Sequence, residues 1–370
     1  MSQLNLYRND RDKWKDIENS PKQSESENTF DENEKPRYAL LIELQYHLRN
    51  EDESLVRYLL EQEIIARNNF SIQGGEDALL LSAYLLARFK NPHDIRLFYE
   101  AKHSNFDASC TIGTEFLFCA LGDQTNDFVR ETFPEIYPDI SGYDSKSDCD
   151  SSLADWWEGL ANDYPNKIEN ESLYTLYQRS IYFNDYSLAR EYLEQWNEET
   201  PDSADKDSTL KYMYIEIKDY ANAIELLRKE LASTDSHEDR LICYQSLLEL
   251  YIKSEQFTDG FKSIKLIDHE LQQFNRWKHS NLGNMTLTQI FEFSLSIDDP
   301  ETAINSFKIG YKWLRKINND ICYFGLKSAF ETATKHSLPE AAKLEELSLS
   351  ERKRIDKNLM PDSWFKNLFR

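Results

Sequence analysis

The sequence predicts an all-α protein made of stacked helical hairpins, with an N-terminal helical region followed by a region of helical repeats. Two observations support this prediction: glycine and proline are scarce, and a helix–break–helix pattern recurs along the chain. Only 10 glycines and 10 prolines occur in 370 residues, whereas average usage is about 7% and 5%. Tight turns between strands need glycine for its positive φ, and phosphate-binding loops need it for close backbone approach. Long helices joined by short polar loops need much less glycine.

The recurring pattern is clearest at four short polar breaks, each followed by a second apolar segment. These breaks begin at Asp185, Asp219, Gln256 and Asp299. The successive spacings are 34, 37 and 43 residues. A period of this size with two helices per unit is typical of helical repeat proteins, in which each hairpin buries its apolar face against its neighbours. Weaker echoes occur at residues 52–56, 91–95, 122–126 and 338–342.

Residues 170–318 also carry a set of small and aromatic residues at recurring places. Small residues stand early in the predicted second helices: Ala189, Ala223, Gly260 and Ala303. Other recurring features are Tyr214, Tyr251, Phe307, Gly310 and Pro201. On these residues the segment resembles the tetratricopeptide-repeat family, in which the small residue lets two helices pack closely. The sequence departs from the family at four first-helix positions that usually hold a small residue: Tyr177, Lys211, Leu248 and Phe291.

Changes in composition divide the chain into four segments. Residues 1–35 are polar and charged, and we expect them to be partly flexible. Helical hairpins are predicted over residues 36–140, and an acidic linker with a short helix from Ser151 or Ser152 over residues 141–170. The resemblance implies that residues 171–370 form a tetratricopeptide-like repeat domain. Its exposed end is expected to be capped by C-terminal apolar residues: Trp364, Phe365, Leu368 and Phe369.

The charge of the chain limits its partners. There are 66 acidic and 43 basic residues, which gives a net charge of −23. Nucleic acids and anionic membranes are bound through cationic side chains, so neither is an expected partner. A basic protein or peptide is a better candidate, because electrostatic attraction between oppositely charged proteins speeds their association. Simple solubility is the other explanation of an acidic surface.

The location predicted from the sequence is the cytoplasm. The N-terminus has no apolar core of the signal-peptide type, and no run approaches the ~18 apolar residues of a membrane span. The five cysteines are scattered without CxxC spacing, as is typical of reduced thiols in a cytosolic protein.

Signatures of catalysis and nucleotide binding do not occur: GxGxxG, GxxxxGK[ST], HExxH and GxSxG are all missing from the sequence. We therefore expect no enzyme activity, no cofactor and no metal ion. One catalytic alternative stays open. If residues 98–119 are helical, His103, Asp107 and Cys110 lie near one face, where the histidine would activate the thiol. A buried cysteine beside a surface histidine and aspartate explains the same residues.

The resemblance implies that the first helix of each pair lines a concave groove. The residues expected to face the groove and bind a partner are Tyr174, Gln178, Tyr182, Tyr212, Glu216, Gln245, Glu249, Lys253 and Glu292. Aromatic, amide and acidic groups together suit a basic or polar peptide segment. The alternative is that several of them only pack between hairpins.

The function predicted from these features is non-catalytic protein binding by a helical repeat protein. The most specific hypothesis is an acidic, immunity-type inhibitor that neutralises a basic toxin or effector. A peptide-sensing regulator of the tetratricopeptide type is the alternative, with the N-terminal helices passing the signal on. An enzyme that uses the Cys/His pair is a second alternative.

Overall fold

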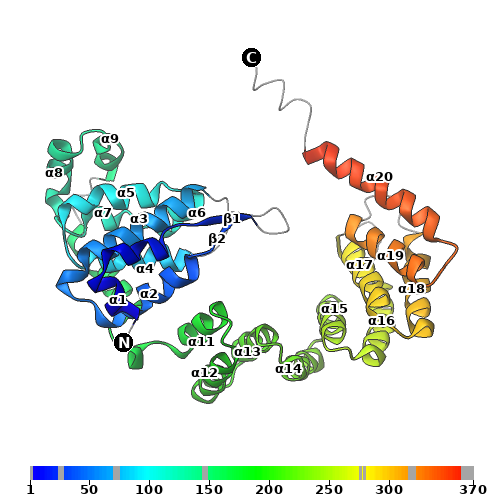
Figure 1. Ribbon diagram of the computed structural model, residues 1–370. Coiled ribbons are helices and arrows are strands. Elements are labelled where there is room, and N and C mark those ends of the chain that lie inside the picture. The colour runs from blue at the N-terminus through cyan, green and yellow to red at the C-terminus, as the bar shows by residue number, and fades with distance from the viewer. Residues whose placement is uncertain are drawn as a thin grey trace. The chain divides into compact units, whose positions relative to one another are not determined.

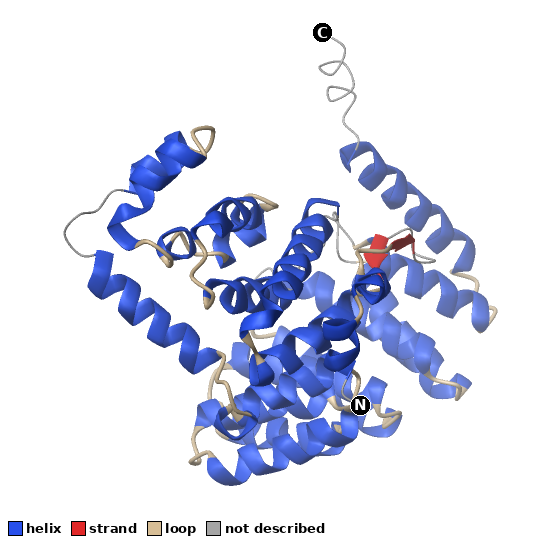
Figure 2. Cartoon of the chain, turned by 60° about the vertical axis from the view of Figure 1, so that its left-hand side comes forward, coloured by secondary structure: helices blue, strands red, loops and turns tan. Residues whose placement is uncertain are grey.

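The computed structural model describes residues 3–23, 29–69, 76–143, 149–274, 277, 281–315 and 322–359. Within these ranges helices dominate, and the strands form one short antiparallel hairpin (Figure 2). The predicted all-α fold is therefore confirmed. The chain divides into two compact units, residues 1–179 and residues 180–370. The predicted C-terminal cap, at residues 364–369, lies outside the described residues.

The first unit is built around three long helices. Its elements, with η for 3-10 helices, are α1 (Gln3–Asn9), η1 (Arg11–Ile17), β1 (Pro21–Gln23), β2 (Thr29–Asp31), α2 (Glu34–His47), η2 (Asn50–Asp52), α3 (Glu53–Asn69), α4 (Glu76–Ala87), η3 (Pro92–Asp94), α5 (Ile95–Lys102), α6 (Phe106–Thr111), α7 (Glu115–Phe118), η4 (Gly122–Gln124), α8 (Thr125–Thr132), α9 (Tyr137–Ile140), η5 (Ser141–Tyr143), α10 (Cys149–Asp163), η6 (Ile168–Asn170) and α11 (Leu173–Tyr182). Helix α4 packs against α2 and α3. Leu41, Leu59 and Leu81, one from each helix, are fully buried in this core.

A buried arginine holds the N-terminal hairpin on the first unit. Arg37 of α2 is fully buried and donates hydrogen bonds to Asp31 of β2 and to Glu63 of α3. A buried charge is costly unless it is paired and hydrogen-bonded, and here both partners are carboxylates. Segment 1–35 was expected to be partly flexible, but its described residues form α1, η1 and this hairpin. The polar composition of this segment predicts that Asp31 is solvated, whereas in the structure Asp31 is buried against Arg37.

The second unit is a succession of antiparallel helix pairs (Figure 1). Beyond the end of α11, its helices are α12 (Tyr186–Glu199), α13 (Ala204–Glu216), α14 (Tyr220–Ala232), α15 (His237–Lys253), α16 (Phe257–Leu271), α17 (Asn281–Ser296), α18 (Pro300–Leu314), α19 (Tyr323–Lys335) and α20 (Ala341–Leu359). We call α11, α13, α15, α17 and α19 the first helices and their successors the second helices. The first helices α15, α17 and α19 also pack side by side.

The same turn joins the helices of most pairs. A residue with φ between 52° and 62° ends the first helix at Asn184, Lys218, Glu255 and Ser337. The next N–H then bonds to the carbonyl five residues back, as from Asp219 to Tyr214 at 2.8 Å. This is the Schellman helix ending. Asp185, Asp219 and Asp299 each cap the following helix through a side-chain oxygen. The breaks predicted from the sequence are helix caps.

The small residues predicted in the second helices are all buried. Ala189, Ala223 and Ala303 have no exposed surface. Farther along α18, a Cβ at Gly310 would lie only 2.9 Å from the ring of Phe291. The large residues Leu248 and Phe291, at first-helix positions where the family prefers small ones, are fully buried as well.

The boundary between the two compact units falls inside α11, between residues 179 and 180. Arg179 ties the start of this helix to the first unit. Its guanidinium bonds to Glu171 at 2.9 Å, to the Tyr46 hydroxyl at 2.8 Å and to the Gln45 amide oxygen at 2.9 Å. These bonds attach the first two turns of α11 to α2 of the first unit. Helix α10 is also longer than the short helix expected near Ser151.

Candidate functional site

The candidate site is the exposed side of the first helices in the second unit, which we call the first-helix face. Five of the nine predicted partner-binding residues are exposed on it: Tyr212, Glu216, Glu249, Lys253 and Glu292. On α11, Tyr182 is half-buried. Tyr174 is exposed and Gln178 half-buried, and both belong to the first unit. The structure therefore gathers the residues of α13, α15 and α17 in one unit.

Gln245 does not face outward as the sequence prediction required. Its side chain is 7% exposed, and its amide donates a hydrogen bond to the Thr286 hydroxyl of α17. Gln245 thus packs between two first helices. The sequence spacing alone does not tell which side of a first helix packs against the next hairpin and which side faces solvent. Residues on these two sides are separated by less than one helical turn along the sequence.

Three glutamates occupy equivalent positions on neighbouring first helices. Glu249, Glu292 and Glu331 each lie seven residues before the residue that begins the turn into the second helix: Gln256, Asp299 and Leu338. We call these three glutamates the acidic row. Glu331 was not predicted, because the resemblance was traced only to residue 318. The repeat echo at residues 338–342 marks the last helix pair, and counting back seven residues from Leu338 identifies Glu331.

Contacts between the first helices fix how the acidic row is aligned. Gln245 of α15 meets Thr286 of α17, and Gly325 of α19 packs so closely on Thr288 that a Cβ would lie 2.7 Å from its hydroxyl. Each contact joins residues that are two positions away from equivalence, so neighbouring helices are staggered by about 3 Å. Their glutamates therefore follow one another across successive helices. On α13 the equivalent position holds Tyr212, which is 61% exposed.

The charges of the acidic row are unequally neutralised. Glu249 pairs with Lys253 at 2.6 Å, and Glu331 with Lys327 at 3.8 Å. Within the described part of the chain, no cation pairs with Glu292. The pKa of Glu292 is raised, first by partial burial of its carboxyl and then by the negative charge of Glu249. A cation placed beside Glu292 would favour the ionised carboxylate, and this attraction would offset the effects of burial and of the Glu249 charge.

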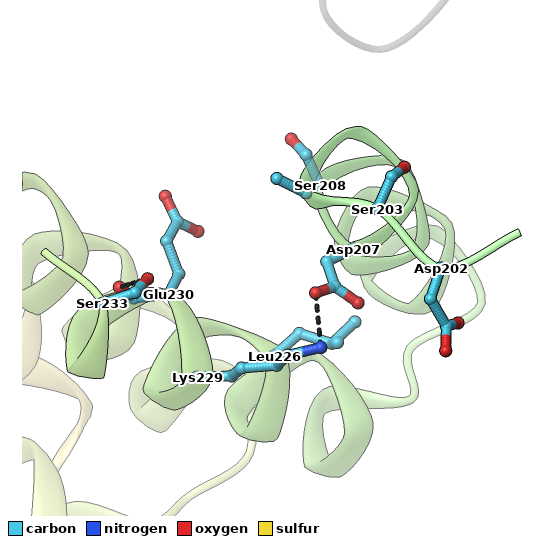
Figure 3. Close-up of a pocket in the computed structure, with 9 residues that line it drawn as sticks. Asp202, Ser203, Asp207, Ser208, Leu226, Lys229, Glu230 and Ser233 are labelled. Atoms are coloured by element: carbon cyan, nitrogen blue, oxygen red, sulfur yellow. Dashed lines mark hydrogen bonds and ion pairs between the residues drawn. The ribbon is translucent and has the colours of Figure 1, made fainter.

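A pocket lies between α13 and α14, and its charges are balanced, unlike those of the acidic row (Figure 3). It encloses about 540 Å³. Lys229 reaches across it to Asp207 at 2.6 Å. Its other two carboxylates are paired as well, Asp202 with Lys206 and Glu230 with Lys211. Because each carboxylate already has a lysine of its own, this pocket attracts a charged ligand less than Glu292 does.

The proposed Cys/His constellation depends on a continuous helix that the fold does not have. Helix α5 ends at Lys102, with His103 as its C-cap, and α6 begins at Phe106. Asn105 starts the new helix by accepting a hydrogen bond from the N–H of Ala108 at 2.7 Å. The condition under which these three residues would share one helix face, a helix over residues 98–119, is therefore not met. His103 Nδ1 lies 2.8 Å from the Tyr99 carbonyl oxygen instead.

No group of three or more His, Cys, Asp or Glu side chains in the described ranges could hold a metal ion. Of the helices described, none is both long and apolar enough to cross a membrane.

Comparison with known proteins adds no relative. No protein-family model matches the chain, and neither the curated proteins nor the solved structures include a significant match. The case for a function therefore comes from the chain's own residues.

Proposed function

We propose that this chain is a non-catalytic protein-binding repeat protein of the tetratricopeptide type, whose first-helix face binds a basic partner. The observation that carries the proposal is the acidic row, in which Glu292 lies near the charge of Glu249 and has no paired cation among the residues that the structure describes. The recurring turn and the stacked pairs support a repeat architecture. In such an architecture, aligned first helices offer one long surface to a partner.

The net charge favours the same kind of partner. At −23, the field of the chain speeds the encounter with a basic protein and slows the encounter with an acidic one. We propose an inhibitor of the immunity type, which acts in the cytoplasm by covering a basic toxin or effector. Inhibition of this kind needs no catalytic group, only a stable complex.

The test combines affinity capture with matched charge variants. The immobilised chain is exposed to lysate of its native cells at low and at high salt, and retained proteins are identified by mass spectrometry. We expect a basic protein that is retained at low salt and lost at high salt, because screening weakens contacts between exposed charges. The variant with glutamine at Glu249, Glu292 and Glu331 should lose this protein.

The control removes the same charge elsewhere. Exposed glutamates of the second helices, Glu191, Glu225 and Glu301, are replaced by glutamine in one variant. Equal loss of the partner in both variants would show that net charge alone governs binding, which contradicts a specific first-helix face. Retention in the control variant alone supports the face.

A peptide-sensing regulator is the second candidate, and helix α11 favours it. This helix is continuous from Leu173 to Tyr182, yet its residues up to Arg179 belong to the first unit. A shared helix is a direct route for passing a binding event from the repeats to the N-terminal helices. A co-purifying peptide whose removal changes the hydrodynamic radius would favour this candidate over an inhibitor.

A further inference from the structure

Three large apolar side chains are exposed at equivalent positions on neighbouring first helices. Ile242 of α15, Met285 of α17 and Phe324 of α19 are 48%, 60% and 66% exposed. Each lies seven residues, or two helical turns, before a member of the acidic row. We call these three residues the apolar row.

The apolar row differs from ordinary exposed side chains by its order. Scattered apolar residues on a surface are normal and need no explanation. Leu266 of α16 and Leu349 of α20 are of that kind, since they are exposed at positions that do not correspond. The members of the apolar row stand on helices that pack side by side. Ile242 lies one turn from the Gln245–Thr286 bond, and Phe324 adjoins the Gly325–Thr288 contact.

The spacing of the apolar row matches a helix laid across it. Axes of packed helices lie about 8–10 Å apart. Residues seven apart in an α-helix are separated by about 10.5 Å and share a face. A partner helix with an apolar residue every seven positions would therefore meet Ile242, Met285 and Phe324 in turn. In a β-strand, residues on one face repeat at about 7 and 13 Å, and neither spacing fits.

The acidic row supplies the second recognition element. It runs parallel to the apolar row, about 10.5 Å farther along each first helix. An α-helix with its side chains is about 10–12 Å wide, so a helix over the apolar row extends about 5–6 Å to each side. Extended lysine or arginine side chains on its flank would span the remaining distance to Glu249, Glu292 and Glu331. Cationic flank residues would neutralise Glu292, whose carboxyl is partly desolvated beside Glu249.

We propose that the first-helix face binds an amphipathic basic α-helix of its partner, with the apolar row as anchors and the acidic row as the charged flank. This inference rests on the proposed function and gives the basic partner a definite form. It predicts a heptad pattern of apolar residues in the partner, flanked by lysine or arginine.

The test uses designed peptides as probes. A fluorescent helical peptide carries leucine every seven residues and lysine on its flanks, and its Kd for the full chain is measured by anisotropy. A second peptide has serine in place of the leucines, and a third has the same composition in scrambled order. We expect the first peptide to bind at least tenfold more tightly than the other two.

Variants of the chain locate the binding site of the probe. Phe324→Ala and Met285→Ala should each weaken binding by roughly tenfold, as for truncated interface anchors. Both side chains are exposed, so the fold tolerates their loss. Leu266→Ala removes an apolar side chain that is 44% exposed on a second helix, and it should leave Kd unchanged within twofold.

The outcomes separate the two proposals. If the serine peptide binds as tightly as the leucine peptide, the amphipathic-helix inference is overturned while basic recognition stands. If no basic peptide binds and the glutamine variant of the acidic row captures the same proteins as the wild type, the proposed function itself fails. If sedimentation shows a dimer that Phe324→Ala dissolves, the occupant is a second copy, and the inference is again overturned.

Discussion

Gly260 of α16 lies directly against the ring of Phe293 of α17. A Cβ at Gly260 would sit 2.4 Å from Cε2 of that ring, closer than carbon atoms approach without repulsion. Phe293 has no exposed surface and belongs to the core shared by α15 to α20. The absence of a side chain at residue 260 is thus a condition for the packing of two successive helix pairs.

Replacing this glycine should weaken the second unit. Alanine normally stabilises a helix interior by about 1 kcal/mol relative to glycine. At Gly260 the added methyl must displace a buried ring, and such overpacking costs about 1–3 kcal/mol. We expect Gly260→Ala to lower the free energy of unfolding by about 1 kcal/mol. Denaturant unfolding, with hydrogen exchange of α16 and α17, measures the effect.

Two variants check the cause. Gly159→Ala in α10 adds a methyl where no atom lies within 4 Å, so it should stabilise the first unit by a few tenths to 1 kcal/mol. Combining Gly260→Ala with Phe293→Leu should restore part of the loss, because the smaller side chain makes room. A Gly260→Ala variant as stable as the wild type would contradict the close approach.

The Glu270 cluster predicts a pH-dependent contribution to stability. Burial opposes ionisation of Glu270, but hydrogen bonds from His237 at 2.6 Å and Arg240 at 3.3 Å outweigh it and lower its pKa. A carboxylate with a lowered pKa stabilises the fold above its ordinary pKa, and this contribution is lost as the pH falls through the lowered value. Glu270→Gln should therefore cost about 1 kcal/mol at pH 7 and progressively less below pH 4.5. A difference that stays constant down to pH 3 would exclude this account.

Arg179 should be among the most sensitive residues of the first unit. Its side chain is 8% exposed and its partner Glu171 1%. Removing one member of a buried ion pair leaves the other uncompensated, at a cost of about 3–5 kcal/mol. Arg179→Ala should destabilise the first unit by this amount and expose the amides of α11 to exchange. The control is Arg190→Ala. The Arg190 side chain is 43% exposed in its ion pair with Asp219, so losing this pair should lower the free energy of unfolding by less than about 1 kcal/mol.

Thiol reactivity tests the catalytic alternative. Burial raises the pKa of Cys119 to about 12 and that of Cys243 to about 11, so both should resist a thiol reagent at pH 8 until the chain unfolds. Cys110 and Cys322 are exposed and should react readily at similar rates. If Cys110 reacts a hundredfold faster than Cys322, the Cys/His enzyme regains support.

Local chemistry explains why the sequence predicted the breaks between helices. A capping aspartate bonds a backbone N–H only three residues away, as Asp185 does to Leu188, so the pattern is visible within a short window. The small residues of the second helices were predictable for a related reason. Their spacing from each cap is nearly constant, and the resemblance assigned them a packing role that their burial bears out.

The candidate site was only partly predictable. Glu249 and Glu292 were found by counting along the first helices, and Glu331 follows from the same count once the last pair is recognised. The apolar row escaped notice because Ile242, Met285 and Phe324 look like core residues in a linear pattern. Their exposure depends on which side of each first helix the neighbouring hairpins cover.

The sequence by itself determined the helical class, the places where helices end and the sign of the net charge, since these depend on residue type and on neighbours within a few positions. Only the tertiary structure decided that Gln245 is buried, that Arg179 joins α11 to the first unit and that the glutamates of three helices align. Those facts depend on contacts between residues 37 to 134 positions apart. Packing free energy selects such contacts for the whole unit at once, and a local pattern cannot specify them.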